Sequence, residues 1–179
     1  MNLELINLNA ENKDIEHFEK INNEAFPDYE RMSFDKIFEL ASNTNTDVLG
    51  IYDGDLPIGF TVLLKNSECG YIYFLAIDSR IRSKGYGSEA IKKLIQMYSD
   101  IQIVLDFEEI NDKAENNAQR IRRKGFYLRN GFHETGNYTI LNDERFEVVC
   151  TGGELRKEAL CELLGILHKN RPGFLDVLL

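Results

Sequence analysis

A short segment between an apolar run and a helical pattern has the composition of a phosphate-binding turn. The sequence Arg-Ser-Lys-Gly-Tyr-Gly at 82–87 follows the apolar run 71–77 and precedes helical periodicity over 88–98. A helix start carries unpaired backbone N–H groups and a partial positive charge, which together attract an anion. Gly85 and Gly87 let the backbone approach a phosphate closely. The arginine and lysine add positive charge, so the segment predicts a pyrophosphate cradle and a phosphate-bearing cofactor.

Two common phosphate loops are excluded by the spacing. A Walker loop needs G-x-x-x-x-G-K-[ST], and the dinucleotide fingerprint needs G-x-G-x-x-G at the start of a βαβ unit. The segment reads R-x-x-G-x-G instead, after a strand that ends Leu75-Ala76-Ile77-Asp78. The plain alternative is a strand-to-helix turn in which the glycines serve only the backbone geometry.

A second motif lies downstream, where Tyr-x-x-x-Gly-Phe occupies 127–132. Gly131 stands where a helix C-cap uses a positive φ, and Asn130 before it continues a helix poorly. Phe132 then begins a strand. The pair of motifs resembles the GNAT N-acetyltransferase family, whose acetyl-CoA loop reads [Q/R]-x-x-G-x-[G/A] and in which a helix after the fifth strand ends in Tyr-x-x-x-Gly-Phe. The resemblance covers roughly residues 3–150.

The resemblance implies acetyl-CoA as co-substrate and no metal. Backbone N–H groups of 83–88 would hold the pyrophosphate, and the end of the fourth strand would contact the acetyl group, with the N–H of Ile77 polarising its carbonyl. The cofactor-binding residues implied in this way are Leu75, Ala76, Ile77, Arg82, Ser83, Lys84, Gly85, Tyr86, Gly87 and Ser88.

Tyr127 matches the tyrosine that the family uses to protonate the leaving thiolate. A phenol is protonated at neutral pH and can donate to a thiolate. The alternative is a tyrosine that only packs on an amphipathic helix. The chain departs from the family at Arg120, where members often carry an asparagine that contacts the pantetheine, and Asn116 or Asn117 could substitute for it.

The base that neutralises the acceptor amine is not identified by a motif. Glu30 and Glu24 rank first, because they fall in the helix–loop region that walls the acceptor site in the family. Other polar side chains near the expected site are read as surface or packing residues: Asp28, Glu108, Glu109, Tyr71, Tyr73 and His133.

The cations at 120–124 are concentrated in a protein that is otherwise acidic. Most of them are interpreted as a solvated helix face balanced by nearby acidic residues. Arg122 or Arg123 could still reach the 3′-phosphate of CoA, or the helix could contact an acidic acceptor.

Composition indicates one compact domain without nucleic-acid or membrane partners. The 179 residues are 43% hydrophobic and 28% charged, with a formal net charge of −9. This charge disfavours binding to nucleic acid or an anionic membrane and favours a cationic acceptor. No apolar run approaches the ~20 residues of a membrane span, and no signal peptide is evident at the N-terminus. Three scattered cysteines form neither a disulfide framework nor a zinc pattern, so a cytoplasmic location is expected.

Hydrophobic periodicity predicts an α/β (α+β) fold with a mixed central sheet of about six to seven strands flanked by helices. Two helices would be capped by Asp14 and Ser33, and an Asp-Gly hairpin would turn at 53–55. Strands are expected at 3–8, 47–52, 58–64, 71–77, 101–107, 132–140 and 146–150, and further helices at 88–98, 118–129 and 155–168.

The predicted organisation is an acetyltransferase-like domain over 1–150 and a C-terminal helical extension over 151–179. This extension would pack on the domain or lie at the interface of a homodimer, because the apolar tail 174–179 needs a partner surface.

Two functions compete at this point. The first is an acetyl-CoA-dependent N-acetyltransferase that acts on a primary amine of a small molecule or peptide by direct attack in a ternary complex. The second is a non-catalytic module that binds or senses acyl-CoA on the same fold, because fold does not settle function. A nucleotide site of another α/β protein is disfavoured by the missing Walker lysine.

Overall fold

The computed structural model describes residues 2–81, 84–141, 143–170 and 174–178. Two compact units make up the chain. Unit 1 contains Met1–Leu64 and Ile72–Met97, and unit 2 contains Lys65–Tyr71 and Tyr98–Leu179.

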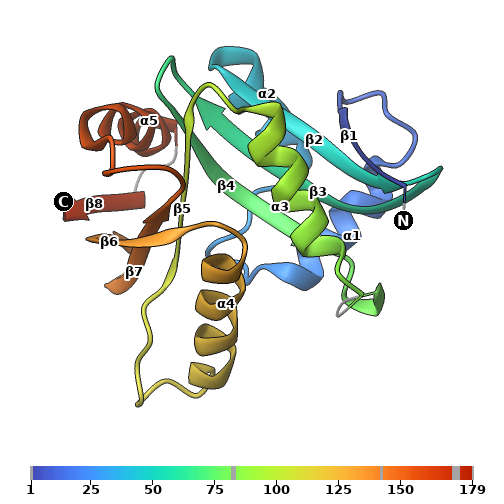
Figure 1. Cartoon of the computed structure of the whole chain (residues 1–179). Coiled ribbons are helices and arrows are strands. Elements are labelled where there is room, and N and C mark those ends of the chain that lie inside the picture. Colours follow the sequence, from blue (N-terminus) through green and yellow to red (C-terminus); the bar gives the residue numbers. More distant parts are fainter. Residues whose placement is uncertain (1, 82–83, 142, 171–173, 179) are drawn as a thin grey trace. The chain divides into compact units, whose positions relative to one another are not determined.

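Unit 1 is built on four neighbouring strands in the order β1-β2-β3-β4 (Figure 1). The pairs β1–β2 and β2–β3 are antiparallel. The elements of this unit are β1 (Leu3–Asn7), α1 (Ile15–Ala25), α2 (Phe34–Asn43), β2 (Thr46–Asp53), β3 (Leu56–Lys65), β4 (Cys69–Ile77), the 3₁₀ turn η1 (Ser79–Ile81) and α3 (Tyr86–Met97).

The strands of unit 1 bury apolar side chains on both faces. On one face, α1 and α2 pack Phe18 and Phe34 against Phe60 of β3. On the other face, Ala90 of α3 packs against Leu3 and Ile51. Successive side chains of a strand point to opposite faces, so near-continuous apolar runs such as those of β3 and β4 are the sequences that suit such a sheet.

The strands of unit 2 follow the order β4-β5-β7-β6-β8, and of β4 only the residues up to Tyr71 belong to this unit. The first three residues of β4 pair with β5 in parallel, whereas β5–β7, β6–β7 and β6–β8 are antiparallel pairs. The elements of this unit are β5 (Gln102–Glu108), α4 (Asn117–Arg129), β6 (His133–Leu141), β7 (Glu144–Cys150), α5 (Lys157–Asn170) and β8 (Phe174–Leu178).

The expected mixed sheet with flanking helices is confirmed, with one added strand. A helix follows the sheet at Lys157–Asn170, as expected, but Phe174–Leu178 then forms β8 on the edge of β6. An edge strand offers unpaired N–H and C=O groups, which an extended apolar segment can satisfy. In the described part of the chain, no helix has the length and hydropathy needed to cross a bilayer.

The predicted helix ends are partly right. Gly131 has a φ of +91°, and the N–H of Phe132 donates to the carbonyl of Tyr127 at 3.3 Å, which is the predicted glycine C-cap of α4. Asp14 and Ser33 occupy the N-cap positions of α1 and α2, but neither side chain caps its helix. The Asp14 carboxylate accepts a hydrogen bond from the Tyr52 hydroxyl at 3.0 Å instead.

Gly59 on β3 is required by the close approach of β4. A Cβ atom at this position would lie 2.3 Å from the carbonyl oxygen of Ala76 and 3.2 Å from the Cα of Ile77. Both contacts are with backbone atoms, which cannot move aside as a side chain can. The absence of a side chain at Gly59 therefore sets the position of the end of β4.

We predict that Gly59→Ala lowers the free energy of unfolding by ~1–3 kcal/mol, as overpacking of a core typically does. Gly165→Ala is the matched control, because its added Cβ meets nothing within 4 Å inside α5. That variant should gain about 0.5–1 kcal/mol from helix propensity. Urea unfolding followed by circular dichroism measures both changes, and equal stability of Gly59→Ala and wild type would contradict the packing argument.

Candidate active site

The start of α3 has the geometry predicted for an anion site. Gly85 has a φ of +85°, a left-handed conformation that favours glycine. The N–H of Glu89 donates to the carbonyl of Gly85 at 3.1 Å, so the amides of 86–88 precede the first hydrogen bond of the helix. Lys84 is exposed beside them. Arg82 and Ser83, also predicted here, lie outside the described residues.

Tyr86 holds the first turn of α3 to the β2–β3 hairpin. Its hydroxyl donates to Oδ2 of Asp53 at 2.6 Å, and the N–H of Asn2 donates to Oδ1 of Asp53 at 2.7 Å. The bond from Tyr86 is the main reason why the pKa of Asp53 is lowered. The predicted role of Tyr86 in cofactor binding is therefore limited to its backbone, because its hydroxyl is committed to Asp53.

A buried carboxylate shapes the turn between β4 and α3. Asp78 is 6% exposed and accepts hydrogen bonds from Nε and Nη2 of Arg80 at 2.9 and 2.5 Å. These bonds lower the pKa of Asp78 to about 2, so the carboxylate is charged at neutral pH. In the same turn, the hydroxyl of Ser79 donates to Oε2 of Glu24 at 2.9 Å. The predicted base Glu24 thus lies beside the segment that leads into the glycine turn.

The other predicted residues of unit 1 lie at the end of β4 and after α1. Leu75, Ala76 and Ile77 are the last three residues of β4, and Ala76 is buried at 4% exposure. Leu75 and Ile77 pack against the apolar cluster under α3. Glu30 is half-buried in the turn after α1, where its N–H donates to the carbonyl of Pro27 at 3.0 Å.

Tyr127 lies near the C-terminal end of α4 in an aromatic setting. Its ring stacks on Phe107 of β5, with centroids 5.6 Å apart and planes at 9°, and meets the edge of Phe132. Desolvation raises the pKa of the Tyr127 phenol above its ordinary value. Among the described residues, no hydrogen bond to its hydroxyl is present. The phenol is therefore a protonated and uncommitted donor.

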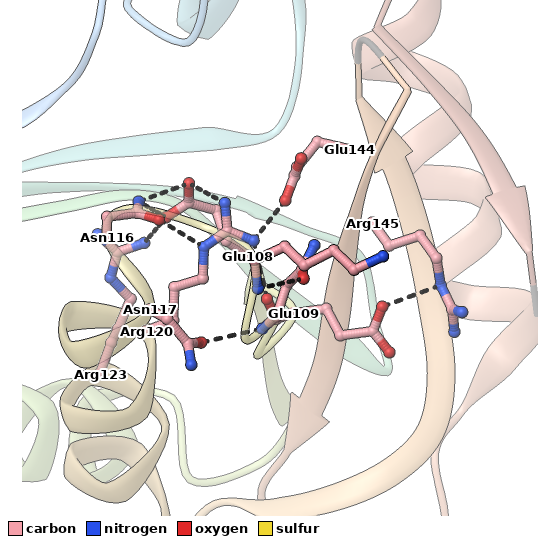
Figure 2. Close-up of polar contacts among 10 residues, drawn as sticks. Glu108, Glu109, Asn116, Asn117, Arg120, Arg123, Glu144 and Arg145 are labelled. Carbon is pink, nitrogen blue, oxygen red and sulfur yellow. Dashed lines mark hydrogen bonds and ion pairs between the residues drawn. The ribbon is translucent and has the colours of Figure 1, made fainter.

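The basic start of α4 is a buried ion-pair network, shown in Figure 2. Arg120 is 6% exposed; its Nη2 lies 3.3 Å from Oε1 of Glu108, and its Nη1 pairs with Glu144. Arg123 lies 3.0 Å from Oε2 of Glu108. The expectation of a solvated face is wrong for Arg120, because acidic residues from β5 and β7 surround it.

The two asparagines considered as substitutes also belong to this part of unit 2. Oδ1 of Asn116 accepts from Nε of Arg120 at 2.8 Å, and its Nδ2 donates to Glu108 at 3.1 Å. Oδ1 of Asn117 accepts from the N–H of Asn111 at 2.9 Å, and its Nδ2 donates to Asp112 at 3.1 Å. Both amides are thus engaged in organising the loop before α4.

The sequence analysis missed Asp106, in the middle of β5. Its Oδ1 accepts a hydrogen bond from the Tyr71 hydroxyl at 2.9 Å, and its Oδ2 accepts one from Thr139. Desolvation raises the pKa of Asp106 above its ordinary value, although both hydroxyls oppose this shift. A single aspartate within an apolar run was the available signal.

The predicted residues fall into two groups. The end of β4, the start of α3, Glu24 and Glu30 belong to unit 1, whereas Tyr127 belongs to unit 2 together with Asp106. Within the described ranges, no cluster of three or more histidine, cysteine, aspartate or glutamate side chains could hold a metal ion.

Both the sequence and the fold of this chain are similar to known proteins. A profile described as the acetyltransferase (GNAT) family matches residues 14–132. Among curated proteins, none matches this sequence. A solved protein from Bacteroides thetaiotaomicron assigned to the GNAT acetyltransferases is similar over 93% of this chain and 94% of its own, with 27% identity and a TM-score of 0.68.

Two further solved structures share the fold at lower identity. Arabidopsis thaliana Naa50, in complex with the bisubstrate analogue CoA-Ac-MVNAL, is 19% identical over 86% of this chain and 100% of its own, with a TM-score of 0.61. A chimera of the spermidine N-acetyltransferase SpeG from Vibrio cholerae and hSSAT is 18% identical over 90% of this chain and 99% of its own, also with a TM-score of 0.61.

We predict that Arg120→Met lowers the free energy of unfolding by ~3–5 kcal/mol, because it leaves the buried carboxylate of Glu108 without its nearest buried cation. Arg129→Met, an exposed change on the same helix, should stay within about 0.5 kcal/mol of wild type. Urea unfolding at neutral pH compares the two. A small effect at Arg120 would mean that Arg123 alone neutralises Glu108.

Proposed function

Because this chain belongs to the GNAT family of acetyltransferases, and is therefore an acyltransferase, we propose that it transfers an acetyl group from acetyl-CoA to a primary amine of a small molecule or peptide. The observation that carries the proposal is the start of α3. There a left-handed Gly85 is followed by helix amides that precede the first intrahelical bond. This is the arrangement that binds phosphate groups at helix N-termini.

The donor would be held mainly by the backbone. The amides of 84–88 would bind the pyrophosphate, and Lys84 would add positive charge, with Arg82 and Ser83 as predicted further contacts. The residues Leu75–Ile77 would border the acetyl group at the end of β4. The close approach of β4 to Gly59 gives this strand end a fixed position within unit 1.

Tyr127 would act as the general acid for the departing thiolate of CoA. A proton donor must keep its proton until the transition state, and the raised pKa of Tyr127 ensures this at neutral pH. Its hydroxyl is not committed to another described group, so it can donate to sulfur. The stacking on Phe107 limits the orientations of the ring.

The acceptor would be cationic before it reacts. With a net charge of −9, the protein attracts ammonium groups over a distance. A structural neighbour carries a peptide-linked analogue of CoA and another is a spermidine N-acetyltransferase chimera, which supports an amine acceptor without choosing its class. Glu24 and Glu30 stay predictions for the base, as do the homodimer and the cytoplasmic location.

We predict that Gly85→Val weakens acetyl-CoA binding at least about tenfold, because a β-branched residue does not adopt the left-handed conformation that presents these amides. Gly136→Val is the matched control: its φ is +71°, and an added Cβ meets nothing within 4 Å. Calorimetric titration with acetyl-CoA compares both variants with wild type. Equal weakening in the two variants would show general strain rather than loss of a binding loop.

We predict that Tyr127→Phe lowers kcat by ~10²-fold or more while the Kd for acetyl-CoA is unchanged. Because the pKa of Tyr127 is raised, wild type should show no alkaline loss of activity from this group below pH ~10. Tyr138→Phe serves as control, since Tyr138 contacts Arg145 through its ring, which the change retains. Steady-state kinetics with near-normal kcat in Tyr127→Phe would exclude the general-acid role.

A further inference from the structure

Three carboxylates lie on the central strands of unit 2, and one of them lacks a cation among the described residues. Glu108 pairs with Arg120 and Arg123, and Glu147 lies 2.8 Å from Nζ of Lys124. Asp106 is half-buried on β5, two residues before Glu108 and directly opposite Val148 of β7, and no cation of the described residues pairs with it. Asp106 thus stands out from its two neighbours by having only neutral partners.

Those partners hold the Asp106 carboxylate in place without neutralising it. Tyr71 is 3% exposed and Thr139 is fully buried, and each hydroxyl donates to a different oxygen of Asp106. An ionised carboxylate offers about four acceptor positions. Besides these two hydroxyls, the carboxylate has a bond to the backbone of Asp106 itself, so capacity for a further donor remains, and the residue is half-buried rather than fully buried.

Withdrawing a carboxylate from water without a counter-ion is unfavourable, and neutral hydrogen-bond donors offset only part of this cost. Desolvation penalises a carboxylate that has no counter-ion, and here it raises the pKa of Asp106. A group of this kind, held by hydrogen bonds and shifted in pKa, is more often found at functional sites than elsewhere. A positively charged ligand would supply the counter-charge that no described residue provides.

The position of Asp106 on β5 complements that of Tyr127. Side chains alternate along a strand, so Asp106 points to the face of β5 opposite Phe107. Phe107 is the residue on which Tyr127 stacks. The hydroxyl donor Tyr127 and the Asp106 carboxylate therefore lie on opposite faces of β5.

We propose that the Asp106 carboxylate binds the ammonium group of the acceptor and removes its proton, with Tyr71 and Thr139 as positioning residues. The inference rests on the proposed acetyl transfer and identifies the acceptor class as a primary ammonium. It assigns the base to β5 in place of Glu24 or Glu30, whose region precedes β2 in the chain.

The proton balance of the reaction is complete with these groups. Asp106 takes one proton from the ammonium and later releases it to water. The freed nitrogen lone pair attacks the thioester carbon, the C–S bond breaks, and its electron pair stays on sulfur. Tyr127 protonates that sulfur and regains a proton from the amide nitrogen. The products are the acetylated amine, CoA with a free thiol and one proton in solution.

Four elements face or act on Asp106 and decide how it titrates. Tyr71 of β4 and Thr139 of β6 donate to it and lower its pKa. Val148 of β7 is directly opposite and carries no charge. Tyr127 of α4 is coupled to it electrostatically, since the charge of Asp106 raises the pKa of Tyr127. The acidic limb of a pH–rate profile should therefore report Asp106.

The test uses full-length protein with acetyl-CoA and three probe amines: spermidine, kanamycin and a lysine-containing peptide. With the best of these amines, Asp106→Asn should lower kcat/KM by ~10²–10⁴-fold and abolish the acidic limb of its pH profile. Asp106→Glu should restore part of the rate and the limb. Tyr71→Phe removes a bond that lowers the pKa of Asp106, so it should move the limb to higher pH.

Asp100→Asn, an exposed change in the same unit, is the control and should match wild type. Calorimetry with acetyl-CoA shows whether each variant is folded and loaded. If Asp106→Asn binds acetyl-CoA and keeps both the wild-type rate and the acidic limb, Asp106 is only a polar link between strands and the inference fails alone. If wild type binds acetyl-CoA but acetylates none of the amines, the proposed function fails with it.

Discussion

In each unit, the fully buried carboxylates among the described residues are paired with cations. In unit 1, Arg80 neutralises the buried Asp78 and thereby forms the turn that follows β4. In unit 2, Arg120 and Lys124 neutralise Glu108 and Glu147, which ties α4 to the strands that it covers. The ion pairs thus place the helix that carries Tyr127. Asp106 on β5 is half-buried and accepts hydrogen bonds only from neutral donors among the described residues, and this is where we propose that a charged substrate binds.

The backbone geometry at two glycines positions the end of β4 and the start of α3. Gly59 allows a strand approach that any Cβ would block, and Gly85 adopts a conformation that favours glycine. After β4 the chain turns at Asp78 and then enters α3. The first amides of α3 precede the first hydrogen bond of the helix. Binding groups made from backbone carry little sequence signal apart from the glycines themselves, which explains why so short a motif can specify a phosphate site.

Much of the fold follows from the sequence, because periodicity and turn chemistry are local. The glycine C-cap at Gly131 and the helix that ends there are correctly predicted, as are the helix after the glycine turn and the seven strands before α5. Contacts between residues far apart in the sequence cannot be predicted from local patterns. The sequence suggests that Arg120 is a surface cation, whereas in the structure Glu108 and Glu144 surround it. Asp106 reads as one polar residue in a strand until Tyr71 and Thr139, 35 and 33 residues away, converge on it.

The central claim is that the chain catalyses acetyl transfer to an amine, rather than binding acyl-CoA without turnover. The most direct measurement is mass spectrometry of wild-type reactions that contain acetyl-CoA and one primary amine at a time. The account predicts an acetylated amine that accumulates in equal amounts with free CoA, and no free CoA above background when the amine is omitted. Tight binding of acetyl-CoA without acetylation of any amine would contradict the account and leave a non-catalytic acyl-CoA-binding module.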